Sequence, residues 1–258
     1  MRTIAVINQK GGSGKTTTAV NLAAGLAENK RNVLLIDLDP QGSTSSWLGV
    51  SDGDGKSLYD VFVNKVHIDA IITRTEVEYL DAVPASNWLF GLDKALAHEV
   101  GSETILKQQF KKLSGKYDYV LIDCPPNLGI LTINALTAVQ EVIIPVEARV
   151  MALSGLVQLM QTIDVIKERL NKDLHIAGIV PCRVDGRTKH AKEVVSALES
   201  NFKGMLYKTA IRENVRLSEA PSFTKPITEY DTRSYGAFDY RSLASEVILQ
   251  EQKQTVIV

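Results

Sequence analysis

The chain has 258 residues, of which 45% are hydrophobic and 23% are charged, and its formal net charge is −1. These values are ordinary for a globular protein, and the length is sufficient for a large core. The near-zero net charge excludes a general attraction to nucleic acid or anionic lipid, so any such binding must come from a local patch.

Short apolar runs alternate with helical patterns along the chain. The predicted strands are Ile4–Ile7, Val33–Ile36, Tyr79–Val83, Tyr119–Ile122, Glu141–Val146, His175–Val180 and a short Met205–Tyr207. The predicted helices are Thr16–Glu28, Leu89–His98, Glu103–Leu113, Ile130–Val139, Leu153–Leu170, Ala191–Asn201 and Tyr240–Gln252. This alternation predicts an α/β fold in which a twisted, mostly parallel sheet has helices on both faces. Ligands bind such sheets at the carboxyl ends of the strands.

The pattern contains no internal repeat and no low-complexity linker, so we expect residues 1–258 to form a single domain. Two cysteines, Cys124 and Cys182, lie in apolar runs without metal-ligand spacing, and we interpret them as buried thiols in a reducing cytoplasm. We expect no signal peptide, because the chain enters directly into a strand. We also expect no transmembrane helix, because no apolar run approaches about 18 residues.

The most informative segment is residues 8–17, Asn-Gln-Lys-Gly-Gly-Ser-Gly-Lys-Thr-Thr, between a predicted strand and a predicted helix. Its glycines let backbone N–H groups turn inward and form an anion cradle with the start of the helix. In such a phosphate loop Lys15 reaches the β- and γ-phosphates and the Thr16 hydroxyl binds Mg²⁺. The predicted nucleotide-binding residues of the loop are Gly11, Gly12, Ser13, Gly14, Lys15, Thr16 and Thr17.

The loop departs from the general phosphate-loop pattern in one respect. Gln9 stands where a glycine is expected five positions before Gly14, and a second lysine, Lys10, follows it. The alternative to a phosphate site is a glycine-rich turn that binds nothing. The three glycines, the Gly-Lys-Thr sequence and the flanking elements together favour the phosphate site.

Carboxylates follow two of the predicted strands. Asp123 ends an apolar run, as the aspartate of a Walker-B strand does, and such an aspartate holds Mg²⁺. The alternative interpretation is that Asp123 caps a turn before two prolines. Asp37 and Asp39 follow another strand and precede a Pro-Gln-Gly turn. In an extended chain this spacing points both carboxylates to the same side. We assign Asp39 to the attacking water, and Asp37 either to an outer position around Mg²⁺ or to a structural role.

Together these motifs resemble the deviant Walker-A partition ATPases of the ParA/Soj type, in the ParA/MinD superfamily of P-loop NTPases. The resemblance covers nearly the whole chain and includes residues 131–138 and residues 214–222, which read Asn-Val-Arg-Leu-Ser-Glu-Ala-Pro-Ser. The loop alone also fits nitrogenase iron proteins, Min-system ATPases and arsenite-pump ATPases. The Asp-Pro-Gln-Gly sequence at residues 39–42 and the segment from residue 214 favour the partition branch.

The resemblance implies an ATPase with weak intrinsic activity that uses ATP and Mg²⁺ and forms an ATP-bound homodimer. Lys10 would reach the phosphates of the other subunit, as an arginine finger does elsewhere with an effect of about 10³–10⁵ in rate. The implied catalytic residues are Lys10, Lys15 and Asp39, Lys10 also being nucleotide-binding. Thr16 and Asp123 would hold the metal, and Asn214 would lie near the base.

The resemblance also implies non-specific binding of double-stranded DNA. The longer relatives have an N-terminal helix-turn-helix domain, which we do not expect here because the loop begins at residue 8. A basic patch runs from Arg183 to Lys192, and its alternative interpretation is a solvated helix face. By resemblance, Arg187 and Arg216 occupy positions of DNA-binding arginines. The predicted DNA-binding residues are Arg187, Lys189 and Arg216.

The favoured function is an ATP-dependent DNA-partitioning switch in the cytoplasm, associated with the nucleoid and stimulated by a ParB-type centromere-binding protein. One alternative keeps the enzyme but positions a protein cargo on the nucleoid. Another is a Min-like membrane ATPase, which needs a basic amphipathic C-terminal helix; after Arg241 the only basic residue is Lys253. A third is a nucleotide-binding module without activity, which the full set of charged residues argues against.

The chain departs from the family pattern at two places. Arg212 and Glu213 stand where the family commonly has Pro-Arg. Glu147 stands where it usually has glutamine, and Arg149 where it has an acidic residue. The second change alters the charge next to the expected dimer face.

Overall fold

Within the described residues, seven strands form one sheet in the order β3-β4-β2-β5-β1-β6-β7. The structure is a computed structural model that describes residues 1–52, 56–113, 115–148 and 152–255, with the backbone alone for residues 152–154 and 252–255. The strands are β1 (Arg2–Val6), β2 (Val33–Asp37), β3 (Thr73–Arg74), β4 (Leu80–Val83), β5 (Tyr119–Asp123), β6 (Glu141–Glu147) and β7 (His175–Cys182). Every neighbouring pair is parallel except β3 and β4. The predicted α/β fold with a mostly parallel sheet is confirmed.

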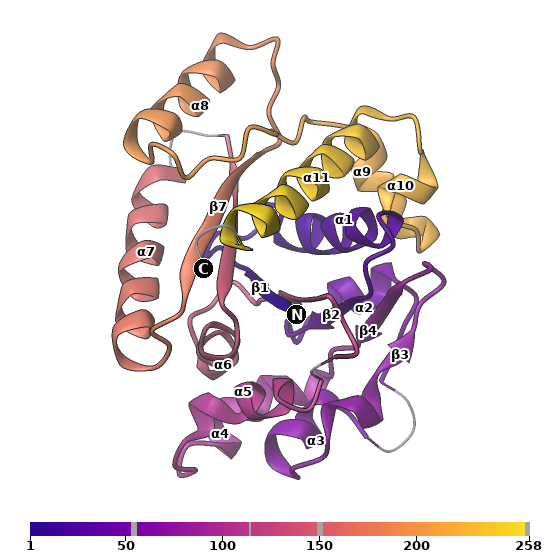
Figure 1. Cartoon of the computed structure of the whole chain (residues 1–258), viewed down its shortest axis with the longest axis vertical. Coiled ribbons are helices and arrows are strands. Elements are labelled where there is room, and N and C mark those ends of the chain that lie inside the picture. Colours follow the sequence, from indigo (N-terminus) through magenta and orange to yellow (C-terminus); the bar gives the residue numbers. More distant parts are fainter. Residues whose placement is uncertain (53–55, 114, 149–151, 256–258) are drawn as a thin grey trace.

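Helices cover both faces of this sheet (Figure 1). They are α1 (Lys15–Glu28), α2 (Ser43–Trp47), α3 (Leu58–Val63), α4 (Leu92–Ala95), α5 (Ile105–Phe110), α6 (Ile130–Ala138), α7 (Ala152–Arg169), α8 (Lys189–Asn201), α9 (Val215–Glu219), α10 (Ile227–Tyr230) and α11 (Tyr235–Thr255). Along β1, Ile4 and Val6 join the apolar cluster that contains α1 and α11, whereas Ala5 and Ile7 join the cluster beneath α5 and α6. The central strands are buried on both faces, which explains why their sequences are continuously apolar.

Some predicted elements differ from the structure. Residues 205–207 form no strand, and Leu206 makes only an isolated bridge with Ile179. The predicted helix Leu89–His98 is a 3-10 segment, Asn87–Gly91, followed by the short α4, because Gly91 weakens the helix at their junction. The helix predicted over 103–113 likewise begins as 3-10 and is helical only over α5.

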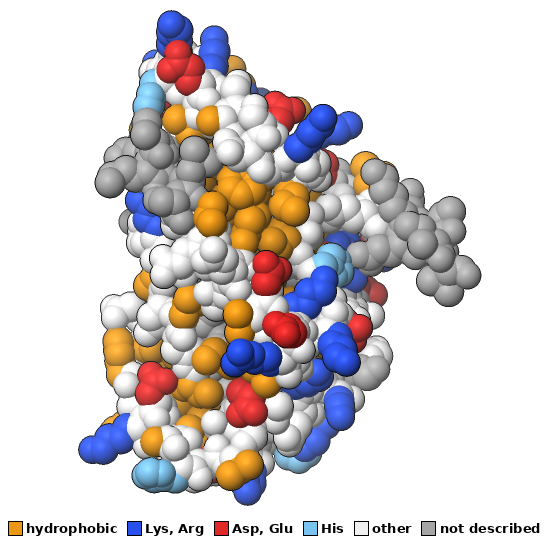
Figure 2. All heavy atoms as spheres, turned by 90° about the vertical axis from the view of Figure 1, so that its left-hand side faces the viewer, with side chains coloured by type: hydrophobic (Ala, Val, Ile, Leu, Met, Phe, Trp, Pro, Cys, Tyr) orange, Lys and Arg blue, Asp and Glu red, His pale blue; other side chains and the backbone are white. Residues whose placement is uncertain are grey.

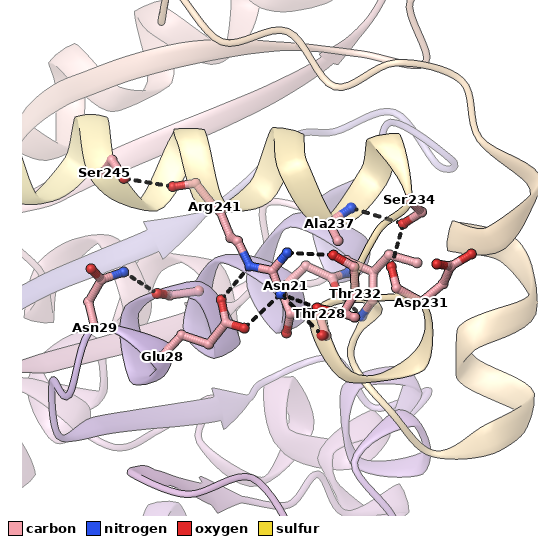
Figure 3. A network of polar contacts seen from close by, with 12 residues as sticks. Asn21, Glu28, Asn29, Thr228, Asp231, Thr232, Ser234, Ala237, Arg241 and Ser245 are labelled. Carbon is pink, nitrogen blue, oxygen red and sulfur yellow. Dashed lines mark hydrogen bonds and ion pairs between the residues drawn. The ribbon is translucent and has the colours of Figure 1, made fainter.

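The C-terminal helix α11 packs along α1, the helix that follows the phosphate loop. A Cβ on Gly25 would lie 3.0 Å from Ala244 Cβ and 3.2 Å from the Tyr240 carbonyl oxygen, so glycine allows this close approach. Arg241 on α11 donates to both carboxylate oxygens of Glu28 at 2.8 Å and to the Thr232 carbonyl at 2.7 Å (Figure 3). These contacts fix α1, and therefore the start of the loop's helix, against the C-terminal part of the chain.

Replacing Arg241 with alanine should lower the free energy of unfolding by about 1–2 kcal/mol, because its hydrogen bonds to Glu28, Thr228 and Thr232 are lost at a partly exposed site. Urea unfolding followed by circular dichroism measures the change. Arg233→Ala, which removes the same charge from an exposed neighbouring position, is the control and should change it by less than about 0.5 kcal/mol. Equal effects of the two variants would contradict the role of the Arg241 contacts.

Candidate nucleotide and metal site

The site forms where β1, β5 and β2 end side by side. The pairing places Val6 opposite Asp123, and Asp37 opposite Asp123 on the other side. Because these strands are parallel, the segments that follow them emerge at one edge of the sheet. The phosphate loop, the Asp123 turn and the Asp37–Gly42 turn are therefore brought together, although they are far apart in sequence.

The phosphate loop has the backbone conformation that its glycines predict. Gly12 has φ +73° and Gly14 has φ +95°, in the left-handed region that residues with a Cβ rarely adopt. Lys15 begins α1 and is 8% exposed, and its Nζ lies 3.3 Å from the Lys10 carbonyl oxygen to which it donates. Burial lowers the pKa of Lys15, and the nearby carboxylates of Asp123 and Asp39 oppose that shift.

Asp123 is fully buried and links the loop to α2. Its Oδ2 accepts hydrogen bonds from Thr16 Oγ1 at 2.8 Å and Thr44 Oγ1 at 2.7 Å. Its Oδ1 is buried and has no hydrogen-bond partner among the described residues. Burial raises the pKa of Asp123 to about 6, although the hydroxyls of Thr44 and Thr16 lower it. A carboxylate and a hydroxyl at this distance form a donor set suited to Mg²⁺.

The two carboxylates after β2 have different surroundings. Asp37 is 1% exposed, and its Oδ2 accepts from the Ser45 backbone N–H at 2.7 Å and the Ser45 hydroxyl at 2.6 Å. Asp39 is half-buried and lines the cavity described below. Asp37 thus fixes the turn into α2, whereas Asp39 is available at the cavity wall.

A cavity of about 560 Å³ lies over the phosphate loop. Of the residues predicted from the sequence, it is lined by Gly11, Gly12, Gly14, Lys15, Thr16, Thr17, Asp39 and Asn214. Its remaining wall is Pro126, Cys182, Arg183, Ile211, Arg212, Glu213, Val215, Leu217, Ser218 and Tyr240. Ser13, within the loop, and Asp123, at the end of β5, are buried and do not line the cavity.

The far end of the cavity is built around Arg212 and Asn214. The Arg212 guanidinium forms a forked ion pair with the nearly buried Asp239, at 2.5 Å for the shortest contact, and lies 4.2 Å from the centre of the Tyr235 ring. Asn214 Oδ1 caps α9 by accepting from the Arg216 N–H at 2.9 Å. The segment at residues 212–214 is therefore held by its own contacts at the cavity wall.

Sequence reasoning missed several residues of the site. Thr44 and Ser45, which hold Asp123 and Asp37, belong to a Ser-Thr-Ser-Ser run after the Pro-Gln-Gly turn, and that run was the available signal. Cys182 and Tyr240 reach the cavity from β7 and α11, and no local pattern indicates this. Both cysteines are buried thiols, as predicted, and burial raises the pKa of Cys182 to about 12.

The three predicted DNA-binding residues each have an acidic neighbour. Arg187 pairs with Asp185 at 2.9 Å, and Lys189 pairs with Glu193 at 3.7 Å. On α9, Arg216 pairs with Glu219 at 2.8 Å and with Asp231 at 3.4 Å. On the face with α7 and α8, blue basic side chains at the upper end have red acidic ones among them (Figure 2).

A family model described as an AAA domain matches residues 1–176. The sporulation initiation inhibitor protein Soj of Bacillus subtilis is 47% identical over 245 residues, which are 95% of this chain and 97% of that protein. The chain belongs to the ParA/MinD family of P-loop ATPases. The chromosome partitioning protein ParA of Myxococcus xanthus is 43% identical over 251 residues, or 97% of this chain and 89% of that protein. The chain is therefore a ParA-type partition ATPase.

The fold is also found in solved structures. The crystal structure of cobyrinic acid a,c-diamide synthase from Mycobacterium smegmatis, with bound ATP analog and magnesium, is 34% identical with a TM-score of 0.86. The match covers 98% of this chain and 96% of that chain. The similarity therefore extends beyond the phosphate loop to the C-terminal elements that complete the cavity.

The titration of Asp37 should make stability depend on pH. Burial raises its pKa to about 7 from an ordinary 3.8, so raising the pH between these values favours the unfolded state, by up to about 1.4 kcal/mol per pH unit. Asp37→Asn removes this dependence. The free energy of unfolding of the variant, relative to wild type, should therefore rise between pH 5 and pH 7 and level off above about pH 8.

Urea unfolding at several pH values measures this difference. Asp52→Asn, at an exposed position away from the site, should keep the wild-type pH dependence. Parallel stability curves for Asp37→Asn and wild type would show that Asp37 does not titrate in this window.

Proposed function

We propose that this ParA-type ATPase is a DNA-partitioning switch, in which Mg-ATP drives formation of a sandwich dimer that binds DNA without sequence preference. A ParB-type centromere-binding protein would stimulate hydrolysis and reset the cycle, so that chromosome or plasmid DNA is segregated on the nucleoid in the cytoplasm. The observation that carries the proposal is the buried Asp123 carboxylate, joined to Thr16 at the start of α1 with one oxygen unpaired among the described residues.

The residues present fit ATP and Mg²⁺, the cofactors of this family. Gly11 and Gly12 line the cavity, and a Cβ built on either would have nothing within 4 Å, so the loop borders open space. The unpaired Asp123 Oδ1 and the adjacent Thr16 hydroxyl would hold the metal, either directly or through water. When bound, Mg²⁺ neutralises charge on the phosphates.

The charged residues of the site then have distinct roles. Lys15, buried at the start of α1, would hold the β- and γ-phosphates, and Asp39 at the cavity wall would orient the attacking water. Lys10, which is exposed at the surface, would act on the phosphates of the other subunit. Phosphoryl transfer depends mainly on positioning and charge neutralisation, so a lone subunit should hydrolyse ATP slowly.

Two substitutions separate nucleotide binding from hydrolysis. Lys15→Ala should weaken ATP binding at least about 100-fold, because it removes a buried charge-assisted contact. Asp39→Ala should bind ATP normally and accumulate as a dimer. Fluorescent-ATP titration and sedimentation velocity measure the two outcomes.

Lys172→Ala is the control, because this exposed lysine precedes β7 and therefore lies at the opposite edge of the sheet. It should match wild type in both measurements. Normal ATP affinity in Lys15→Ala would refute the loop assignment, and normal hydrolysis in Asp39→Ala would refute the role of Asp39.

The ion pair between Arg187 and Asp185 gives a test in which two substitutions should change DNA affinity in opposite directions. The hydrogen bonds from Arg187 lower the pKa of Asp185 to about 2, so this acid is charged at neutral pH and competes with DNA phosphates. Asp185→Asn should therefore strengthen DNA binding about two- to fivefold. Arg187→Ala should weaken DNA binding, and the slope of log affinity against log salt concentration should become shallower by about 0.9. Titration of a random-sequence duplex at several salt concentrations, with Mg-ATP present, measures both.

Asp173→Asn, a neutralised acid at an exposed position before β7, is the matched control and should leave DNA affinity unchanged. If neither Asp185→Asn nor Arg187→Ala changes DNA affinity, Arg187 does not face DNA.

The structure also bears on the Min-like alternative. Among the described residues no helix is both long and apolar enough to cross a membrane. The apolar residues Leu243, Ala244 and Val247 of α11 are fully buried in the cluster with α1. Those three side chains are therefore unavailable for lipid, whereas Tyr235, Phe238 and Leu249 on the same helix are exposed.

A further inference from the structure

Three neighbouring strands bring a chain of charged residues to the mouth of the cavity. β1 pairs with β6, and β6 pairs with β7. Lys10 follows β1, Glu147 is the last residue of β6, and Arg183 follows β7. Asn8 fixes the first two relative to each other, since its Nδ2 donates to the Pro145 carbonyl at 2.7 Å and its Oδ1 accepts from the Lys10 N–H at 3.0 Å.

Among the described residues, Lys10 and Arg183 contact Glu147 through different carboxylate oxygens. Lys10 Nζ lies 3.0 Å from Glu147 Oε2, and Arg183 Nη1 lies 3.2 Å from Glu147 Oε1. Arg183 Nη2 is also 3.6 Å from Glu213 Oε1. The Glu147 side chain is 6% exposed, whereas those of Lys10 and Arg183 are 43% and 49% exposed. The centre of this ion-pair chain is therefore a nearly buried carboxylate with a half-exposed cation on either side.

This arrangement holds Lys10 within its own subunit. A carboxylate with so little solvent contact depends on its cations, because burial makes an uncompensated charge unfavourable. Arg183 stays paired with Glu147 if Lys10 leaves, so release of Lys10 does not leave the carboxylate without a cation. Lys10 can thus exchange Glu147 for another anion of comparable or greater charge, such as a phosphate group.

We propose that Glu147 is a positioning residue for the ATPase reaction: it retains Lys10 in its own subunit and so opposes dimerisation until phosphates of a second subunit compete for Lys10. This inference rests on the proposed function, because it requires Lys10 to act across a dimer. A half-exposed ion pair shifts an equilibrium by about two- to fivefold, and a symmetric dimer breaks two of them. Glu147 should therefore weaken the dimer about tenfold.

The first test measures the dimer directly in an Asp39→Ala background, which prevents ATP from being consumed. Sedimentation equilibrium with Mg-ATP should show that Glu147→Gln lowers the dimer dissociation constant about tenfold. Glu147→Asp, which keeps the charge for Arg183 but shortens the reach to Lys10, should give an intermediate value. Glu213→Gln removes the same charge from the cavity mouth without a contact to Lys10, and should change the constant less than about twofold.

The second test measures the restraint on Lys10 in the monomer. Acylation of Lys10 by a succinimidyl ester without nucleotide, quantified by mass spectrometry, should be about threefold faster in Glu147→Gln and unchanged in Glu213→Gln. A merely structural effect would not single out Lys10 among the exposed lysines. Lys172, modified in the same sample, provides the internal control.

The outcomes separate the inference from the proposed function. If the Asp39→Ala reference stays monomeric with Mg-ATP, the proposed function fails and this inference fails with it. If the reference dimerises but neither Glu147 variant changes the dissociation constant, only the inference is overturned. An unchanged acylation rate at Lys10 in Glu147→Gln likewise overturns the restraint.

Discussion

The buried Asp123 carboxylate accepts hydrogen bonds from Thr16 and Thr44 and so connects α1 with α2 at the centre of the site. It ends β5, the strand that lies between β1 and β2, so one residue contacts both the helix after the phosphate loop and the helix after the Asp39 turn. Burial raises its pKa to about 6, which indicates that the carboxylate is held where its charge is not fully compensated by protein groups. A divalent cation beside it would relieve that imbalance.

Contacts with α1 hold the C-terminal part beside the site. α11 packs closely on α1 through Gly25 and is fixed by Arg241, and it carries Tyr240 to the cavity wall. The cavity is therefore closed by elements from both ends of the chain. Nucleotide binding to such a site links the phosphate loop to α9 and α11, so binding and the packing of the C-terminal helices should stabilise one another.

The sequence was sufficient for the parts that depend on local chemistry. The glycines of the loop, Lys15 and the strand ending in Asp123 are identifiable because backbone conformation and burial restrict which residues stand there. The amino-acid sequence was not sufficient to predict contacts that depend on which strands lie side by side in the sheet. The pairing of Lys10 with Glu147 follows from β1 lying next to β6, and the Arg183–Glu213 contact from β7 lying beside residues 211–213. Lys10 and Glu147 are more than 100 positions apart in the sequence, and Arg183 and Glu213 are about 30 apart.

The acidic residues Asp185 and Glu193 stand within the basic patch in the sequence, but their ion pairs with Arg187 and Lys189 follow only from the structure. Arg149, one of the departures from the family pattern, lies outside the described residues.

In the proposed function, one subunit's Lys10 acts at the other subunit's site, where Asp39 orients water. Mixing two inactive variants, Lys10→Ala and Asp39→Ala, tests it most directly by steady-state ATP hydrolysis with non-specific DNA present. In a mixed dimer, one site has an intact Asp39 from its own chain and Lys10 from the partner. An equal mixture should recover up to about a quarter of wild-type activity, because random pairing makes half of the dimers mixed and each mixed dimer has one complete site. Activity no higher than that of the separate variants would contradict it.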